Sequence, residues 1–211
     1  MSLAIGWWDA QSQTHRLLTD RRIVSGPFLL QPRAKIVSFH TANAHEAVAL
    51  VGDQRVYQLC SVQRGAYIAE RIGNLRRAII DEGWISTSKT GAPSWNLAGI
   101  MVCQEYGREG GLLYTLDGSF AATMVSRADP FNMAFVGSGA EIGRAILFDA
   151  LRAAKIAELR LDEIALRAMR AASEIRTDVG DGVSLWVSGA PKVLEFANIA
   201  DCEAHLAGGA G

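Results

Sequence analysis

Residues 2–20, SLAIGWWDAQSQTHRLLTD, open the chain with clear β-strand signals. Residues 2–8 are mostly apolar and include two tryptophans, a composition that favours a β-strand. Residues 9–13 supply the polar side chains of a turn, and residues 14–19 return as a second short strand. The chain is therefore expected to open with two strands, the first of which starts at the second residue.

The remainder of the chain is divided into blocks of strands and blocks of helices. Strands are predicted at residues 34–40, 46–51, 95–105, 111–116, 120–124, 132–136, 183–187 and 193–196. Apolar residues recur at helical spacing at about residues 56–80, 140–154 and from 160 onward, and residues 206–211 are expected to form a frayed tail. Such segregated blocks argue against a parallel βαβ sheet and for antiparallel sheets between helix layers.

The composition is that of a folded globular protein. A chain of 211 residues suffices for one large domain, so residues 1–211 are expected to form a single domain. The net charge of −1 gives no electrostatic reason to expect nucleic acid or an anionic membrane as a partner. No apolar run reaches the ~18 residues that a membrane-spanning helix requires. The N-terminus lacks the basic region of a signal peptide, which favours a cytoplasmic location.

Neither a metal site nor a cofactor is implied by the sequence. Its three cysteines, Cys60, Cys103 and Cys202, lack CxxC spacing, and an odd, sparse count suits a reducing cytoplasm. The four histidines show no ligand spacing such as HExxH. Each cysteine is interpreted as a small buried apolar residue.

Six short segments occur in an order and at a spacing that resemble those of a known family. They are SLAIG (2–6), LTDRR (18–22), KIV (35–37), ALVGD (49–53), FVGSG (135–139) and RTDVGDG (176–182). Together they resemble the proteasome β-subunit and its bacterial relatives in the T1 peptidase family of N-terminal-nucleophile (Ntn) hydrolases. The resemblance covers nearly the whole chain and marks it as a divergent, bacterial-type member. It implies an α+β fold, a four-layer α-β-β-α sandwich of two antiparallel sheets between helix layers.

The resemblance also implies a catalytic centre at the N-terminus. Ser2 stands in the place of the family's N-terminal threonine, which acts as nucleophile, so Met1 must first be removed. Lys35 and Asp20 match the family's activating lysine and its carboxylate partner.

Chemistry explains why such residues belong together. An N-terminal α-amine, with a pKa of about 8, can take the proton of the hydroxyl on the same residue, directly or through one water. A cationic lysine beside it lowers the pKa of that amine and stabilises the developing alkoxide. A carboxylate then keeps the lysine ionised and oriented.

Three further positions complete the site that the resemblance implies. Ser138 and Asp178 would form hydrogen bonds around the amine and its water, and the backbone N–H of Ala49 would donate to the oxyanion.

Each side chain also has an ordinary structural interpretation. Asp20 is then a strand-end aspartate and Lys35 an edge lysine that opposes aggregation. Ser138 is a helix N-cap and Asp178 a turn residue.

The sequence departs from the family pattern at four points. Serine replaces threonine at residue 2 and lacks the methyl group that restricts the hydroxyl rotamer. Ala49 stands where the family commonly has glycine, and Asp181 where it usually has serine. The segment after Asp178 is two residues shorter than expected.

Two other interpretations compete with a peptidase. Residues 137–143, GSGAEIG, invite a dinucleotide-binding interpretation, but the glycine spacing is off by one and another helix follows instead of a strand. A catalytically inactive, proteasome-like ring or scaffold subunit is the alternative that remains. The joint presence of Asp20 and Lys35 favours the enzyme.

We therefore expect a peptidase or amidohydrolase that cleaves peptide bonds in peptides or proteins through an acyl-enzyme on Ser2. The family resemblance implies a homo-oligomeric ring, six- or seven-fold or a stacked pair of such rings. An ATPase that feeds the ring is a further partner known in the family, although no docking motif for one is visible in the sequence.

Overall fold

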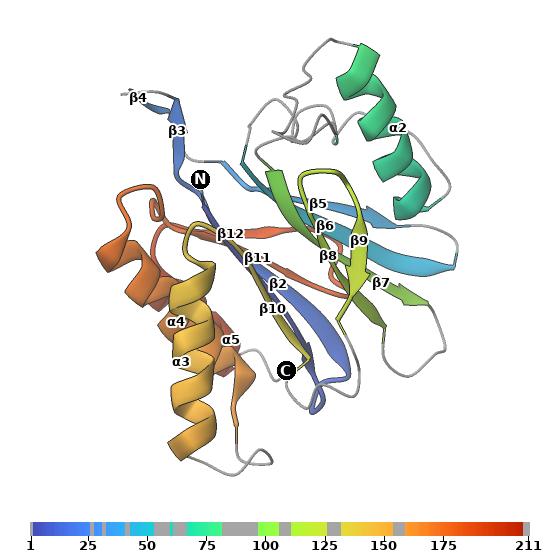
Figure 1. Cartoon of the computed structure of the whole chain (residues 1–211). Helices are drawn as coiled ribbons and strands as arrows, with labels where there is room; N and C mark the ends of the chain where they lie inside the picture. Colours follow the sequence, from blue (N-terminus) through green and yellow to red (C-terminus); the bar gives the residue numbers. More distant parts are fainter. Residues whose placement is uncertain are drawn as a thin grey trace.

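The computed structural model describes residues 2–25, 28–30, 33–40, 43–52, 60, 67–81, 97–105, 111–125, 132–153 and 159–208. These residues form two five-stranded antiparallel sheets that pack face to face, with helices on the outer face of each (Figure 1). The expected α+β, four-layer α-β-β-α sandwich is confirmed.

The first sheet has the strand order β10-β1-β2-β11-β12. Its strands are β1 (Leu3–Asp9), β2 (Thr14–Asp20), β10 (Met133–Gly137), β11 (Val183–Val187) and β12 (Leu194–Phe196). The outer face of this sheet is covered by α3 (Ala140–Ala153), α4 (Leu161–Ile175) and α5 (Ile199–Gly208).

The second sheet has the order β5-β6-β7-β8-β9. Its strands are β5 (Ile36–His40), β6 (Ala44–Gly52), β7 (Leu97–Glu105), β8 (Leu112–Leu116) and β9 (Ala122–Met124), and α2 (Ile68–Asp81) covers it. A two-stranded ribbon, β3 (Ile23–Ser25) and β4 (Phe28–Leu30), connects the two sheets along the chain.

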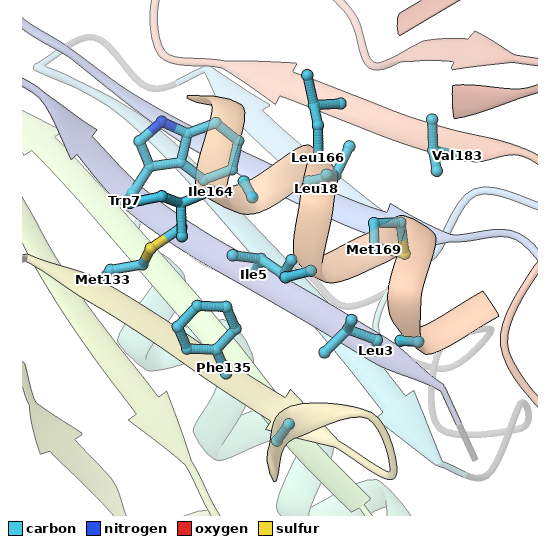
Figure 2. Packing of buried hydrophobic residues seen from close by; sticks show 14 of the residues in the cluster. Leu3, Ile5, Trp7, Leu18, Met133, Phe135, Ile164, Leu166, Met169 and Val183 are labelled. Carbon is cyan, nitrogen blue, oxygen red and sulfur yellow. The ribbon is translucent and has the colours of Figure 1, made fainter. Parts of the chain in front are cut away.

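The alternation of side chains along β1 builds two separate cores. Leu3, Ile5 and Trp7 are fully buried against α4, as Figure 2 shows. Ala4 lies on the opposite face and packs in the cluster between the two sheets. Because successive side chains of a strand point to opposite faces, one apolar strand with both faces buried serves both layers.

The close approach of the two sheets depends on Gly6. A Cβ atom at Gly6 would lie 2.8 Å from Cγ2 of Ile100 and 3.0 Å from Cδ2 of Leu17. A larger residue would therefore push the sheets apart at the centre of the molecule.

Strand pairing brings the ends of distant segments to the start of β1. Leu3 pairs with Gly137 of β10, and Asp20 of β2 pairs with Val183 of β11. The turn after β10 and the loop before β11 consequently lie beside the first residues of the chain. All pairs of the first sheet are antiparallel, so the βαβ unit that dinucleotide binding requires does not occur at residues 137–143.

The C-terminal prediction was wrong in part. Leu206 to Gly208 belong to α5 rather than to a frayed tail, and residues 209–211 lie outside the described residues. The helix is capped by Asn198, whose Oδ1 accepts the Asp201 N–H at 2.8 Å, and its Cys202 is buried against the first core. A cap and one buried face hold a helix that composition alone does not predict.

Two other predictions differ in extent. The predicted helical region at 56–80 is confirmed for α2, while residues 53–59 and 61–66 lie outside the described residues. The strand expected from residue 120 begins at Ala122, because Phe120 has a left-handed backbone with φ 61°. Oδ1 of Asp117 accepts the N–H groups of Ser119 and Ala121 there and makes a turn.

Candidate active site

The two sheets meet at one end through a contact between Ser2 and Lys35. Ser2 directly precedes β1 in the first sheet, and Lys35 directly precedes β5 in the second. Nζ of Lys35 donates to Oγ of Ser2 at 2.5 Å, and both residues are buried, with exposed fractions of 8% and 4% for the lysine and the serine. A buried hydroxyl beside a buried ammonium is an arrangement that favours loss of the hydroxyl proton.

The Lys35 ammonium has an acceptor for each of its three protons. Besides Ser2 Oγ, it donates to Oδ2 of Asp20 at 2.7 Å and to the carbonyl oxygen of Arg22 at 2.6 Å. Three acceptors match the three donors of an ammonium group, so its orientation is fixed.

Asp20, at the end of β2, links this lysine to the start of β1. The side chain is fully buried. Its Oδ1 accepts the N–H of Leu3 at 2.8 Å, and its Oδ2 accepts the N–H of Arg22 at 3.1 Å as well as the Lys35 ammonium. The carboxylate thus holds the residue after Ser2 and the lysine in one arrangement.

Burial and pairing oppose each other in this ion pair. Burial lowers the pKa of Lys35, and the Asp20 carboxylate acts against that shift. Burial likewise raises the pKa of Asp20, against the effect of Lys35 and of the Leu3 N–H. Each partner therefore offsets part of the cost of burying the other's charge, as is general for buried ion pairs.

Ser138 contacts the backbone carbonyl group of Ser2, and Asp178 contacts Ser138. The N–H of Ser138 donates to the carbonyl oxygen of Ser2 at 2.8 Å. Its hydroxyl donates to Oδ2 of Asp178 at 2.7 Å, with a longer contact of 3.4 Å to the Ser2 oxygen. Burial acts to raise the pKa of Asp178, but hydrogen bonds from Arg176 and Ser138 lower it to about 2. An ionised carboxylate consequently stands beside the first residues of the chain at neutral pH.

Ala49, the residue expected to donate to an oxyanion, lies within β6. It is opposite Ile36 of β5 and Ile100 of β7, and its side chain is fully buried. The N–H of the next residue, Leu50, donates to the Lys35 carbonyl oxygen at 3.0 Å. Since successive N–H groups of a strand point to opposite edges, the Ala49 N–H points toward β7.

The sequence did not reveal the part played by Arg22. Its carbonyl oxygen accepts a hydrogen bond from Lys35. Because every residue has a backbone carbonyl group, a sequence pattern cannot indicate such a contact. Its guanidinium forms a two-pronged pair with Asp181, at 3.0 and 2.9 Å. The sequence feature that could have indicated this ion pair is the aspartate at position 181, where the family usually has serine.

Within the described ranges, no group of three or more His, Cys, Asp or Glu side chains could hold a metal ion. The described helices are also too short or too polar for any of them to cross a membrane.

Comparison with known proteins identifies the fold. No protein-family model matches the sequence, and no curated protein matches it. Solved structures do. The Anbu complex from Pseudomonas aeruginosa, solved as a helical assembly, is 14% identical with a TM-score of 0.68, over 99% of this chain and 92% of that chain.

Two further structures are similar. BPH from Thiobacillus denitrificans, in complex with epoxomicin, is 14% identical with a TM-score of 0.59, over 89% of this chain and 97% of the other. HslV from Trypanosoma brucei is 18% identical with a TM-score of 0.53, over 88% and 98%. The chain thus has the proteasome-like Ntn fold that Anbu and HslV also have.

Proposed function

We propose that this protein is an Ntn peptidase that cleaves peptide bonds through an acyl-enzyme on Ser2 after Met1 has been removed. The observation that carries the proposal is the contact of 2.5 Å between the Lys35 ammonium and the Ser2 hydroxyl, in a buried site with Asp20 as the lysine's partner. In an ordinary edge lysine the ammonium is solvated, whereas here all three of its donors are used inside the protein.

The proposed reaction has two stages. The α-amine of Ser2 takes the hydroxyl proton while Oγ attacks the carbonyl carbon, and the proton then passes to the leaving amine as the C–N bond breaks. Water next attacks the ester and loses a proton to the α-amine. The amine returns that proton to Ser2 Oγ as the C–O bond breaks, which releases the acid product and free Ser2. Removal of Met1 is essential because the nitrogen of Ser2 is otherwise an amide, which is not a base.

Lys35 and Asp20 support both stages. The ammonium stabilises negative charge that develops on Ser2 Oγ, and its cost of burial is offset by Asp20. Asp178, with its pKa of about 2, is ionised at neutral pH and reaches the backbone of Ser2 through Ser138. We assign to this pair the orientation of the amine and its water.

An oxyanion donor is the remaining requirement. The backbone N–H of Ala49 is our candidate. Because this N–H points toward β7, the pairing of Ala49 with Ile100 must open when substrate binds.

We also propose that the chain, as a single domain, assembles with copies of itself into a ring of six or seven subunits, alone or stacked. The Anbu structure from Pseudomonas aeruginosa is a helical assembly, which supports self-association in this fold. Phe148 of α3 and Ile175 of α4 are exposed by 60% and 68%, and in the proposed assembly a neighbouring copy would cover such side chains. A monomeric mass in light scattering at micromolar concentration would count against the assembly.

The deciding experiment compares a free with a blocked Ser2 amine. The chain is produced as a fusion whose leader is cleaved directly before Ser2, and both forms are treated with a peptide β-lactone and with epoxomicin. We expect one covalent adduct, mapped to Ser2 by intact mass and peptide analysis, in the cleaved form alone. Ser2→Ala is the matched control, since it keeps the amine and lacks the hydroxyl.

The contrary outcome has a defined meaning. A folded, cleaved protein that forms no adduct and hydrolyses no peptide would indicate the fold without the chemistry, that is, a ring or scaffold subunit.

A further inference from the structure

Arg22 connects the lysine site to the loop at residues 176–182. Through its main chain, it accepts a hydrogen bond from Lys35 Nζ at 2.6 Å and donates one to Asp20 Oδ2 at 3.1 Å. Two contacts of the Lys35–Asp20 pair thus depend on where the Arg22 backbone lies.

The side chain of Arg22 is bound by that loop. Nε and Nη2 donate to the two carboxylate oxygens of Asp181 at 3.0 and 2.9 Å, and Nη1 donates to the Thr177 carbonyl oxygen at 2.7 Å. The side chains of Arg22 and Asp181 are exposed by only 26% and 20%. A two-pronged, half-buried pair of this kind fixes geometry as well as contributing energy.

The loop backbone is shaped for this contact. Asp181 has a left-handed φ of 57°, which aspartate tolerates better than most residues. Gly180 has φ 145°, and a Cβ atom there would lie 3.1 Å from Cζ of Arg22. Its carbonyl oxygen also accepts the Arg22 N–H at 2.9 Å. Strained and glycine-dependent backbone therefore surrounds the guanidinium.

Part of the surface of the Arg22–Asp181 ion pair faces a cavity and is not covered by packed side chains. A cavity of about 360 Å³ borders Arg22 and Asp181 and extends between the 176–182 loop, α4 and the start of α5. With open space on that side, the hydrogen bonds to Asp181 and Thr177 are what hold the guanidinium in place.

We propose that Asp181 is a positioning residue of this site: by clamping the Arg22 guanidinium, it fixes the Arg22 carbonyl oxygen as the third acceptor of the Lys35 ammonium. The inference rests on the proposed function, in which Lys35 activates Ser2. It assigns a role to a position where the resemblance to the T1 family leads one to expect serine.

The state of Lys35 is the direct readout. The chain has four lysines, so selective ¹³C labelling of lysine gives few NMR signals, and that of Lys35 is assigned by its loss in Lys35→Met. The charged groups that act on Lys35 are Asp20 of β2 and Asp178 and Asp181 of the loop, and Arg22 contacts Lys35 through its backbone carbonyl oxygen.

Asp181→Asn removes a carboxylate that raises the pKa of Lys35 and leaves the positive charge of Arg22 without its partner. Both changes act in the same direction. We expect the Lys35 titration to move to lower pH in this variant. Asp181→Gly, which accepts a positive φ without strain, is expected to give the same shift. Glu195→Gln, which removes the partner of the neighbouring Arg21, is expected to give none.

A double-mutant cycle tests whether Asp181 acts through Arg22. In an Arg22→Gln background, Asp181→Asn is expected to produce a clearly smaller shift, because only the direct charge effect of Asp181 on Lys35 remains. An equal shift in both backgrounds would mean that Asp181 acts on Lys35 directly and would overturn the proposal, as would an unchanged titration in Asp181→Gly.

Turnover provides the second readout. In the active enzyme, Asp181→Asn is expected to lower kcat about ten- to a hundredfold with little change in KM, since a misplaced activator acts on the chemical step. A lowered melting temperature with unchanged kcat would indicate a purely structural role and contradict the proposal. Should the wild-type protein with a free Ser2 be inert, the proposed function fails, while the Lys35 titration still decides the role of Asp181.

Discussion

Gly137 lies directly against the carbonyl group of Ser2. A Cβ atom at Gly137 would be 2.0 Å from the Ser2 oxygen, and the backbone there has φ 99°. Only glycine permits this approach, which allows the next residue, Ser138, to donate its N–H to the same oxygen at 2.8 Å. The first glycine of the FVGSG motif, Gly137, is thus a requirement of the site.

Gly137→Ala is accordingly expected to abolish labelling of Ser2, because the methyl group displaces either the N-terminal residue or the turn before α3. Probe labelling followed by intact mass, together with a melting curve, measures the effect. Gly73→Ala is the matched control. No atom lies within 4 Å of a Cβ at this mid-helix position of α2, so alanine there should stabilise by about 0.5–1 kcal/mol and leave labelling unchanged. Full labelling of Gly137→Ala would contradict the role of this contact.

Replacement of Lys35 alone is expected to destabilise the protein as well as inactivate it. Lys35→Met leaves the fully buried Asp20 without its partner, at a cost of about 3–5 kcal/mol in the free energy of unfolding. The double variant Lys35→Met/Asp20→Asn should recover much of that loss and remain inactive. Urea unfolding and peptide hydrolysis measure the two properties. A single variant as stable as the wild type would show that the pair is not an ion pair.

Ser2→Thr is expected to retain the reaction. Threonine keeps the hydroxyl and the amine, and its methyl group narrows the choice of rotamer. Labelling rates of the wild type, Ser2→Thr and Ser2→Ala, each with a free amine, test this. Because residue 2 is buried, the labelling rate also shows whether the site has room for the extra methyl group. A threonine that fits should be labelled at a rate within about tenfold of that of serine, and alanine should not be labelled.

Acid is expected to weaken the contact between the 176–182 loop and the N-terminus. The pKa of Asp178 is lowered from its ordinary value of 3.8 to about 2. A depressed pKa contributes stability that is present above the pKa of the unfolded chain and is lost as the pH falls through that of the folded one, here between about 4 and 2. Urea midpoints at pH 6, 4, 3 and 2.5 should decline more steeply for the wild type than for Asp178→Asn. Parallel curves would mean that this carboxylate has no linked effect.

Gly6→Ala tests the packing between the sheets. Its methyl group meets the tips of Ile100, Leu17 and Leu113 at 2.8–3.1 Å, and these flexible side chains can give way only partly. We expect a loss of about 1–3 kcal/mol in the free energy of unfolding, measured by urea denaturation, as for other overpacked cores. A neutral effect would indicate that the two sheets can separate slightly without cost.

Local patterns in the sequence determined much of this protein. The first two strands, the paired helices α3 and α4 and the order of the blocks follow from apolar periodicity and turn residues, and these sufficed to predict the layered fold. The six motifs also named Ser2, Asp20, Lys35, Ser138 and Asp178, which the structure brings to one end of the sandwich. Their catalytic roles stay a prediction.

How these residues meet depends on the packing of the whole chain. Ser2 and Lys35 belong to different sheets, and Arg22 and Asp181 are 159 positions apart, so their contacts depend on sheet packing and strand register. The Arg22 carbonyl and the Ala49 N–H are backbone groups that every residue carries, and no sequence pattern can single them out. Helix α5 is held by one cap and one buried face. Side-chain periodicity is a local property that the chain records directly, whereas backbone contacts and long-range ion pairs exist only after the whole chain has packed.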